Sequence, residues 1–263
     1  MARPVNSSSY ERVDLMGLDF SGQVAVVTGS GSGIGKAAAL ALAASGARIV
    51  AIDVAAAEET AGAIRGRGGV ATAIAMDVRD AGAWQRAAEL TISKYGTIDI
   101  LVNSAGIAVP GDTAVDVSEE VWDRIIDVNA KGVWLGMKCV LPTMLARRRG
   151  KICNVASTAS HIGLRDAAAY CASKGAVLAL TRQAGVQYAA QNVQINSVSP
   201  GTTMTALQRH VTEQQREAFL KLTPINRFAE SEEIAAVILF LCSAGSSFMA
   251  GADVGVDGGM VAL

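Results

Sequence analysis

Two residues one helical turn apart carry the clearest chemical signal in this sequence. Tyr170 and Lys174 are four positions apart, so on a helix both side chains lie on one face. A free phenol has a pKa of about 10, too high for a base near neutral pH. An ammonium group about 4 Å away contributes roughly 4 kcal/mol at an effective dielectric constant of 20, which favours the phenolate. The pair predicts acid–base chemistry at Tyr170, although a Tyr and a Lys at this spacing can also be purely structural.

Two further polar residues could complete such a site. Ser157 follows an apolar run, where its hydroxyl could orient a substrate oxygen or simply cap a turn. Asn129 interrupts a long helical segment, and Asn is a poor helix former, so it needs a specific partner, such as a water that leads from Lys174. These two residues could hold a substrate oxygen and a water close to the tyrosine.

A glycine-rich segment lies upstream of these residues. Thr28-Gly29-Ser30-Gly31-Ser32-Gly33-Ile34-Gly35 joins an apolar run to an Ala- and Leu-rich stretch. Glycines let the backbone approach a pyrophosphate, and the free N–H groups at the start of a helix favour its negative charge. The spacing differs from the stricter Gly-x-Gly-x-x-Gly fingerprint, so an ordinary glycine turn is the alternative. We expect a dinucleotide at this turn.

Asp53 indicates which dinucleotide binds. It closes the second apolar run, where a carboxylate can accept hydrogen bonds from the adenosine ribose hydroxyls. The same carboxylate would repel a 2′-phosphate, and neither Ser32 nor Val54 supplies a compensating positive charge. The sequence therefore predicts NAD rather than NADP.

The ends of two other apolar runs could face the same ligand. Asp77 could hydrogen-bond the adenine or cap a helix. The small residues Asn103-Ser104-Ala105-Gly106 would let a ligand approach the backbone, or form a simple turn.

These residues require a framework that brings strand ends together. Short β-branched runs alternate with Ala-rich helical stretches, a pattern typical of a parallel sheet with helices on both faces. We expect one doubly wound, Rossmann-like α/β domain of about seven strands over residues 21–263, after an N-terminal arm over residues 1–20. The expected strands are Val24–Thr28, Arg48–Ile52, Ala71–Met76, Ile98–Val102, Ile152–Val155, Val193–Val198 and Asp253–Val256.

Two longer segments complete the predicted framework. A helix is expected over Ser118–Ala146, with an N-terminal capping signal at Ser118. Residues 202–223 are less regular and follow the sixth strand, where a segment can cover the ligand crevice as a lid. A largely apolar substrate is predicted from four apolar residues in this segment, Met204, Leu207, Phe219 and Leu222.

Composition narrows the class of protein. The 23 basic and 24 acidic residues give a net charge of −1, which argues against nucleic acid as a partner. No apolar run is long enough for a membrane span, and the N-terminus has no signal-peptide core, so we expect a cytoplasmic protein. The four cysteines have no metal-binding spacing, so no metal site is predicted.

Together these residues resemble the short-chain dehydrogenase/reductase family, from about Gln23 to the C-terminus. Asn129, Ser157, Tyr170 and Lys174 match the catalytic tetrad of that family. The resemblance implies that Tyr170 removes the alcohol proton while hydride moves to the nicotinamide. It also implies that Lys174 lowers the pKa of Tyr170 and binds the nicotinamide ribose, that Ser157 holds the substrate oxygen and that Asn129 holds a relay water.

The resemblance implies a set of cofactor contacts as well. With Tyr170 and Lys174, they are Gly29, Ser32, Gly33, Ile34, Gly35, Asp53, Asp77, Val78, Asn103, Ala105, Gly106, Pro200, Gly201, Thr203 and Thr205. Ser104 and Thr203 differ from the residues usual in the family, which should tune the cofactor pocket. Members are commonly tetramers, so a homotetramer is expected.

The leading hypothesis is an NAD-dependent enzyme that interconverts a small to medium, largely apolar secondary alcohol and its ketone. The predicted substrate contacts are Ser157, Tyr170, His161, Met204 and Leu207, and His161 could instead be an ordinary loop residue. A 3-oxoacyl reductase acting on an acyl carrier protein is the alternative enzyme. A non-catalytic dinucleotide sensor or scaffold is the alternative of another class.

Overall fold

The computed structural model describes the chain except residues 1–17, 110, 112, 206–211 and 263. Leu207, a predicted substrate contact, and most of the predicted N-terminal arm therefore lie outside the described residues. Phe20 is fully buried in the core, and its amide donates to the carbonyl of Ser45 at 2.8 Å. The arm predicted over residues 1–20 is therefore too long, because the packed domain already includes Phe20.

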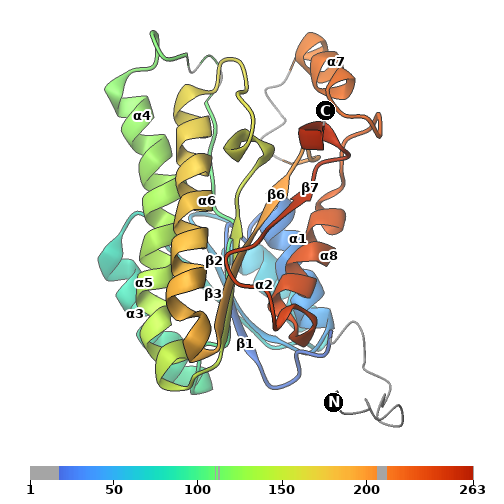
Figure 1. Ribbon diagram of the computed structural model, residues 1–263. Helices are drawn as coiled ribbons and strands as arrows, with labels where there is room; N and C mark the ends of the chain where they lie inside the picture. Colours follow the sequence, from blue (N-terminus) through green and yellow to red (C-terminus); the bar gives the residue numbers. More distant parts are fainter. Residues whose placement is uncertain (1–17, 110, 112, 206–211, 263) are drawn as a thin grey trace, which may run out of the picture.

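A seven-stranded parallel sheet forms the centre of the molecule, as predicted (Figure 1). Its strand order is β3-β2-β1-β4-β5-β6-β7, so the chain builds outward from β1 in one direction and then from β4 in the other. The strands are β1 Val24–Thr28, β2 Arg48–Asp53, β3 Ala71–Ala75, β4 Ile100–Asn103, β5 Gly150–Val155, β6 Val193–Pro200 and β7 Asp253–Val256.

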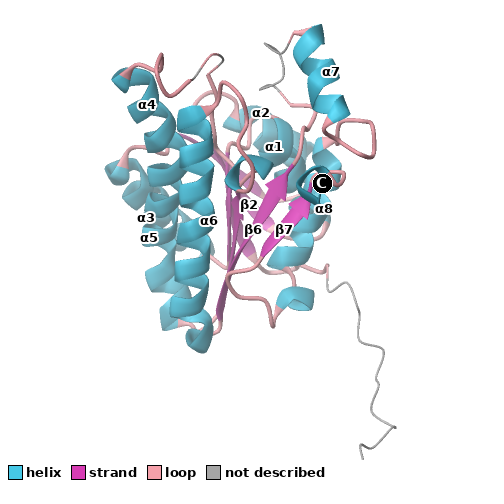
Figure 2. Cartoon of the chain, turned by 45° about the horizontal axis from the view of Figure 1, so that its top comes forward, coloured by secondary structure: helices cyan, strands magenta, loops and turns pink. Residues whose placement is uncertain are grey.

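Helices cover both faces of the sheet (Figure 2). Along β1, Ala25 and Val27 pack into one hydrophobic cluster while Val24 and Val26 pack into the other, which explains the continuous apolar run. The first cluster includes residues of α1 Gly33–Ala44, α2 Ala57–Gly66 and α8 Ser231–Cys242; the second includes residues of α3 Ala81–Tyr95, α5 Gly132–Ala146 and α6 Ala168–Tyr188.

None of the helices in the described part of the chain is long and apolar enough to cross a membrane.

The long helix predicted over Ser118–Ala146 is present but irregular at its centre. It consists of α4 Glu119–Ile126, a π-helical turn over Asp127–Lys131, and α5. The hydroxyl of Ser118 accepts the amide of Val121 at 3.3 Å, as its capping signal predicts. Wide π turns occur frequently at functional sites, and this one contains Asn129.

Between β6 and α8 the chain makes an excursion over residues 201–230 that includes α7 Glu213–Lys221. Figure 1 shows α7 beyond the carboxyl end of the sheet. The excursion is closed at its base, because Thr203 and Ala229 form a parallel bridge. The amide of Met204 donates to the carbonyl of Ala229 at 2.8 Å, and the amide of Ala229 donates to the carbonyl of Thr202 at 2.9 Å.

Candidate active site

The predicted site residues gather at the carboxyl edge of the sheet. The strand order reverses between β1 and β4, and a ligand crevice is expected outside the carboxyl ends of strands at such a point. Thr28, Asp53 and Asn103 end β1, β2 and β4, while Val155 and Pro200 end β5 and β6. The framework therefore brings residues from five strands to one edge.

The glycine turn fits closely against the end of β4. Gly29 has a φ of 64°, and a Cβ at this position would lie 2.8 Å from the Cα of Ala105. The hydroxyl of Thr28 accepts the amides of Ser104 and Ala105 at 3.0 and 3.1 Å, which fixes the two turns together. Ser104 makes this contact through its backbone, so the departure from the family residue leaves the bond intact. The result is a backbone surface that fits a dinucleotide.

Asp53 is held by the glycine turn itself. Its carboxylate accepts the amide of Gly31 at 3.0 Å and the amides of Ala55 and Ala56 at 3.0 and 3.2 Å. A Cβ at Gly31 would lie only 2.9 Å from the carboxylate carbon of Asp53, so the glycine allows this approach. Asp53 is therefore fixed at the end of β2, directly beside the glycine turn.

Asp77, the predicted adenine contact, and Val78, a predicted cofactor contact, both have strong partners within the protein. Arg79 donates to Asp77 through Nε and through Nη2 at 2.6 Å, and this hydrogen bond lowers the pKa of Asp77. Asp77 does not cap α3, since Asp80 accepts the amides at the start of that helix. Val78 is buried, and its carbonyl accepts Trp84 Nε1 at 2.9 Å.

The end of β6 approaches the glycine turn from the other side. Gly201 donates its amide to Val256 at 3.0 Å, and Thr203 donates its hydroxyl to the Gly201 carbonyl at 3.0 Å. A Cβ at Gly33 would lie 3.1 Å from the methyl group of Thr205. Pro200, Gly201, Thr203 and Thr205 therefore lead from β6 to the cofactor turn.

Asn129 is fully buried and ties the π turn to two other elements. Its side-chain amide donates to the carbonyl of Ile107 at 2.9 Å and to the hydroxyl of Ser173 at 3.0 Å. Its side-chain oxygen accepts the amide of Ile107 at 2.8 Å. Asn129 therefore finds its hydrogen-bond partners on the segment after β4 and on α6.

Lys174 lies under the same segment. A Cβ at Gly106 would lie 3.4 Å from Asn129 Oδ1 and 3.5 Å from Lys174 Nζ, so the segment after β4 passes close to both side chains. Lys174 is 4% exposed, and its ammonium group donates to the carbonyl of Val155 at 2.8 Å. Burial lowers the pKa of Lys174 to about 8.

Tyr170 and Ser157 meet at the reacting end of the site. Burial raises the pKa of Tyr170 above its ordinary value, and a hydrogen bond with Ser157 partly opposes that rise. The ammonium of Lys174 lies 5.9 Å from the centre of the tyrosine ring. The net result is a raised pKa for Tyr170, the opposite of the lowering that its spacing from Lys174 predicts.

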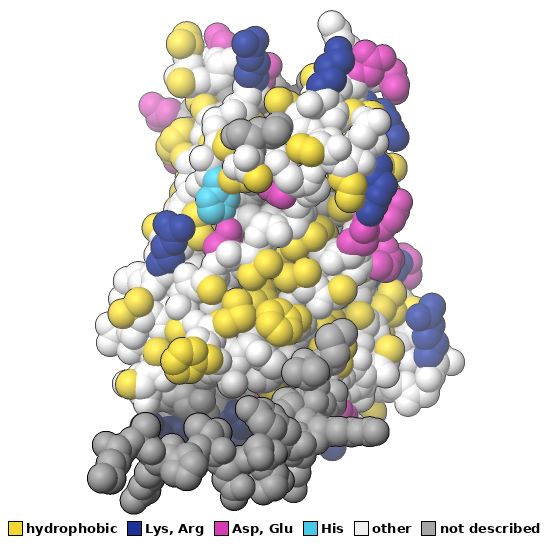
Figure 3. Space-filling view, turned by 45° about the vertical axis from the view of Figure 1, so that its right-hand side comes forward, with side chains coloured by type: hydrophobic (Ala, Val, Ile, Leu, Met, Phe, Trp, Pro, Cys, Tyr) yellow, Lys and Arg dark blue, Asp and Glu magenta, His cyan; other side chains and the backbone are white. Residues whose placement is uncertain are grey.

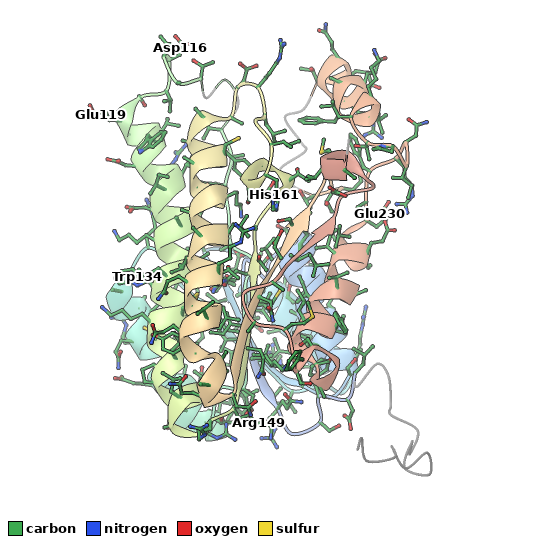
Figure 4. The ribbon with its side chains drawn as sticks, viewed as in Figure 1. Asp116, Glu119, Trp134, Arg149, His161 and Glu230 are labelled. Carbon is green, nitrogen blue, oxygen red and sulfur yellow. The ribbon has the colours of Figure 1, made fainter. Side chains whose placement is uncertain are left out.

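His161 lies on the loop after Ser157 but has partners on the sheet. Its Nε2 is 2.8 Å from Asp253 Oδ2 and 3.3 Å from the hydroxyl of Ser199. Figure 4 shows His161 near the upper ends of β6 and β7. His161, a predicted substrate contact, is thus bonded through Nε2 to Asp253 of β7.

A family profile described as enoyl-(acyl carrier protein) reductase matches residues 29–261 of the chain. The match spans both the glycine turn and the tetrad. The chain belongs to the short-chain dehydrogenase/reductase family. It is accordingly an oxidoreductase of the type that uses a nicotinamide dinucleotide.

Three members of the short-chain dehydrogenase/reductase family illustrate the likeness. The 3-oxoacyl-(acyl-carrier-protein) reductase of Thermotoga maritima is 37% identical and covers 91% of this chain and 98% of its own. Cyclohexanol dehydrogenase of an Acinetobacter species is also 37% identical, covering 93% and 97%. A solved protein from Beutenbergia cavernae, described as an NAD(P)-dependent gluconate 5-dehydrogenase with bound NADP, is 34% identical with a TM-score of 0.89, covering 94% and 100%.

The sequence prediction of this short-chain dehydrogenase/reductase did not include several residues that hold the site residues in place. Ser173 bonds both Asn129 and the Tyr170 carbonyl, the latter at 2.7 Å. Its position directly before Lys174 was a signal that the tyrosine–lysine spacing alone did not use. Thr28 and Gly31 hold the turn ends and Asp53, but their contacts join segments far apart in the sequence, which local patterns do not reveal.

No group of three or more His, Cys, Asp or Glu residues that could hold a metal ion occurs in the described part of this short-chain dehydrogenase/reductase.

Proposed function

We propose that this protein is an NAD-dependent dehydrogenase that interconverts a small to medium, largely apolar secondary alcohol and its ketone. The observation that carries the proposal is the hydrogen-bonded pair of Tyr170 and Ser157, with the buried ammonium group of Lys174 beside the tyrosine ring. A phenol and a hydroxyl that meet in this way can share one substrate oxygen, and a buried cation favours the anionic form of the phenol.

Each residue of the site has one role in alcohol oxidation. NAD, when bound, supplies the acceptor for the hydride that leaves the alcohol carbon. Tyr170 takes the proton of the alcohol hydroxyl, and Ser157 donates a hydrogen bond that fixes the same oxygen. Lys174 keeps a positive charge close to the phenolate. Asn129 holds the π turn and the segment after β4 in place around Lys174.

A base of this kind needs the pKa of Tyr170 to fall below the value set by burial. The positive charge of a nicotinium ring and of Lys174 would both lower it. Because the pKa of Lys174 is about 8, its charge is largely present at neutral pH and is lost as pH rises through that value. Proton removal by Tyr170 is thus favoured where Lys174 is still charged.

The preference for NAD rests on Asp53. Its carboxylate is fixed by three backbone amides, so it cannot easily turn away from a 2′-phosphate. The nearby cation Lys36 is paired with Glu59 at 2.7 Å, which reduces its availability for a phosphate. A negative charge fixed at this position favours ribose hydroxyls over a phosphate.

The apolar character of the substrate rests on the excursion after β6. Met204, Leu222 and Ile225 are 44%, 46% and 55% exposed, although large apolar side chains are usually buried. Exposed apolar groups on a segment beyond the carboxyl edge can cover an apolar ligand.

A 3-oxoacyl reductase is the second candidate, favoured by the 37% identity to the Thermotoga maritima enzyme. Asp53 and the net charge of −1 count against it, because such an enzyme would be expected to accept NADPH and an acidic carrier protein. A non-catalytic dinucleotide sensor is disfavoured because binding alone does not require the bonded Tyr170–Ser157 pair.

We also propose that the protein assembles as a homotetramer. Hydrophobic side chains gather on the face that includes β7 (Figure 3), and β7 is the last strand of the sheet as described. Trp134 on α5 is 44% exposed, as expected for a helix that contacts a second copy. Light scattering during size-exclusion chromatography tests the assembly directly, and a monomer would contradict it.

The decisive experiment is turnover of a panel of secondary alcohols and ketones with NAD(H) and NADP(H), followed by the absorbance of the reduced cofactor. Cyclohexanol and linear secondary alcohols represent the proposed class, and a 3-oxoacyl thioester represents the second candidate. We expect oxidation of apolar alcohols with NAD. Reduction of the thioester with NADPH alone would favour the second candidate, and binding of NAD without any turnover would favour the sensor.

A further inference from the structure

The cluster around His161 lies at the junction of the active-site loop and the last strand. Asp253 is the centre of this cluster, and its carboxylate accepts three groups. Ser197 and Ser199 donate their hydroxyls from β6, Ser199 at 2.8 Å, and His161 Nε2 approaches the same carboxylate at 2.8 Å. The side chain of Asp253 is 8% exposed, so these donors replace its water.

The cluster contains a serine, a histidine and an aspartate, but its geometry excludes a serine-nucleophile relay. Such a relay needs the carboxylate on Nδ1 and the hydroxyl on Nε2 of the histidine. Here Asp253 and Ser199 both approach Nε2, and Ser199 donates its proton to Asp253 instead. The arrangement holds segments together and activates no hydroxyl.

The segment that is held carries Ser157. Ser157 caps the 3-10 turn Thr158–Ser160, where its hydroxyl accepts the amide of Ala159 at 3.1 Å. His161 follows this turn directly, and its amide donates to the carbonyl of Thr158 at 2.9 Å. On the other side, Ser160 donates its hydroxyl to the carbonyl of Lys174 at 2.9 Å. The turn is thus fixed to α6 by Ser160 and to β7 by His161.

We propose that His161, held by Asp253, is a positioning residue for the reaction, and this rests on the proposed function. Ser157 must place a substrate oxygen between its hydroxyl and that of Tyr170. A displacement of about 1 Å in such an arrangement can lower the rate by about a hundredfold. His161 lies four residues after Ser157. It limits the displacement of Ser157 through its contact with Asp253 of β7, which is 92 positions further along the chain.

The first test compares turnover of His161→Phe, His161→Gln and Asp253→Asn. His161→Phe removes the donor, and we expect kcat to fall by about tenfold to a hundredfold with the KM for NAD unchanged. His161→Gln keeps an N–H donor and should recover most of the loss. The double variant of His161→Phe and Asp253→Asn should be no slower than the slower single variant, because each single variant already disrupts the contact between His161 and Asp253.

Three kinetic results would overturn the proposal. One is a kcat for His161→Phe within about twofold of the wild-type value. Another is multiplication of the two single effects in the double variant. A third is a rise in the substrate KM for His161→Phe alone, which would indicate direct substrate contact instead.

The second test does not depend on turnover. Hydrogen exchange of the unmodified full-length protein should show protection of the amides of Ser160, His161 and Ile162, which donate within this turn. His161→Phe should raise the exchange rates of these three amides, and His161→Gln should raise them less. Unchanged exchange in His161→Phe would refute the positioning role. If exchange rises in His161→Phe but the wild-type protein oxidises no alcohol, only the proposed function is refuted.

Discussion

A lysine lies at each end of β5, the half-buried Lys151 and the buried Lys174, and only Lys174 belongs to the proposed active site. Lys151 is in the strand at its start, whereas Lys174 of α6 bonds to Val155 at its end. Burial lowers the pKa of both to about 8. Lys174 lies with Tyr170, Asn129 and the segment after β4, but Lys151 donates to the hydroxyl of Ser246 at 3.1 Å. A shifted pKa therefore reports burial, and the site arises from the groups that meet it.

The neighbours of Lys151 explain why it carries no chemistry. The Cys242 thiol interacts with it electrostatically, but burial raises the pKa of that thiol to about 12. A thiol with such a pKa is neither a nucleophile nor a counter-ion at neutral pH. The amino edge of a parallel sheet also lacks the crevice formed at the carboxyl edge. The comparison predicts that changes at the two ends have very different effects.

The largest effect on activity should follow from removal of the Tyr170 hydroxyl, which lies at the carboxyl end of β5. Tyr170→Phe deletes the phenol hydroxyl, so alcohol oxidation should fall by about a thousandfold or more. Binding of NAD, measured by protein fluorescence, should change by less than about threefold. Tyr188→Phe at the end of the same helix is the control and should keep full activity. Turnover of Tyr170→Phe close to that of the wild type would exclude Tyr170 as the base.

The direct test of the comparison replaces each lysine with methionine. Lys174→Met removes the charge beside Tyr170, and kcat/KM should fall by about a hundredfold. Lys151→Met keeps the length of the side chain at the other end and should retain kcat/KM within about twofold. Equal losses in both variants would mean that the two ends are not functionally distinct.

A smaller effect is expected at the cofactor end of the carboxyl edge. Asp53→Ser removes the fixed charge, and the ratio of kcat/KM with NAD to that with NADP should fall by about tenfold or more. Glu58→Gln, a nearby carboxylate on α2 that pairs with Arg65, is the matched control. A wild-type enzyme that prefers NADP would already show that Asp53 does not determine the cofactor.

The smallest effect concerns stability. The folded-state pKa of Lys151 is about 8, and a free lysine has a pKa of about 10.4, so the unfolded chain binds more protons between these values. The contribution of Lys151 to the free energy of unfolding therefore rises with pH over this window and is least favourable below pH 8. Lys151→Met should raise the thermal midpoint at pH 7 by about 1–3 °C and by less at pH 10. A larger gain at pH 10 would contradict the assigned burial.

Local patterns in the sequence were sufficient for most of the framework. The runs Val24–Thr28 and Asp253–Val256 were predicted with their observed bounds, since β-branched residues and the flanking glycines mark both ends. The strand expected at Ile98–Val102 begins two residues later, at Ile100. Asp99, just before it, accepts the amide of Val24 and pairs with Arg147, so this position is occupied by side-chain contacts that no local pattern reveals.

The site also contains some residues that local patterns reveal and others that they do not. Ser157, Tyr170 and Lys174 could be identified because Ser157 follows a strand and the other two lie on one helix face, whereas Asn129 was marked only as a polar residue in a helical segment. The π turn at Asn129 and the contact between His161 and Asp253 were not readable, because they depend on packing between distant segments. The buried chain of hydrogen bonds from Asn103 through Asn154 to Thr181 links β4, β5 and α6 for the same reason.

The bridge between Thr203 and Ala229 has a consequence for how such an enzyme could be re-engineered. The bridge holds the two ends of the excursion together, so the sheet does not set the length of chain between Thr205 and Thr223. Thr223 and Phe228 are buried, and the amide of Ile225 donates to the carbonyl of Gly258 at 3.1 Å, so the last part of the excursion belongs to the packed domain. Doubling the length of such a closed loop costs only about 0.6 kcal/mol in chain entropy. Segments of different sequence could therefore be transplanted between Thr205 and Thr223 to change which alcohol is accepted, while the cofactor turn and the tetrad are left unaltered.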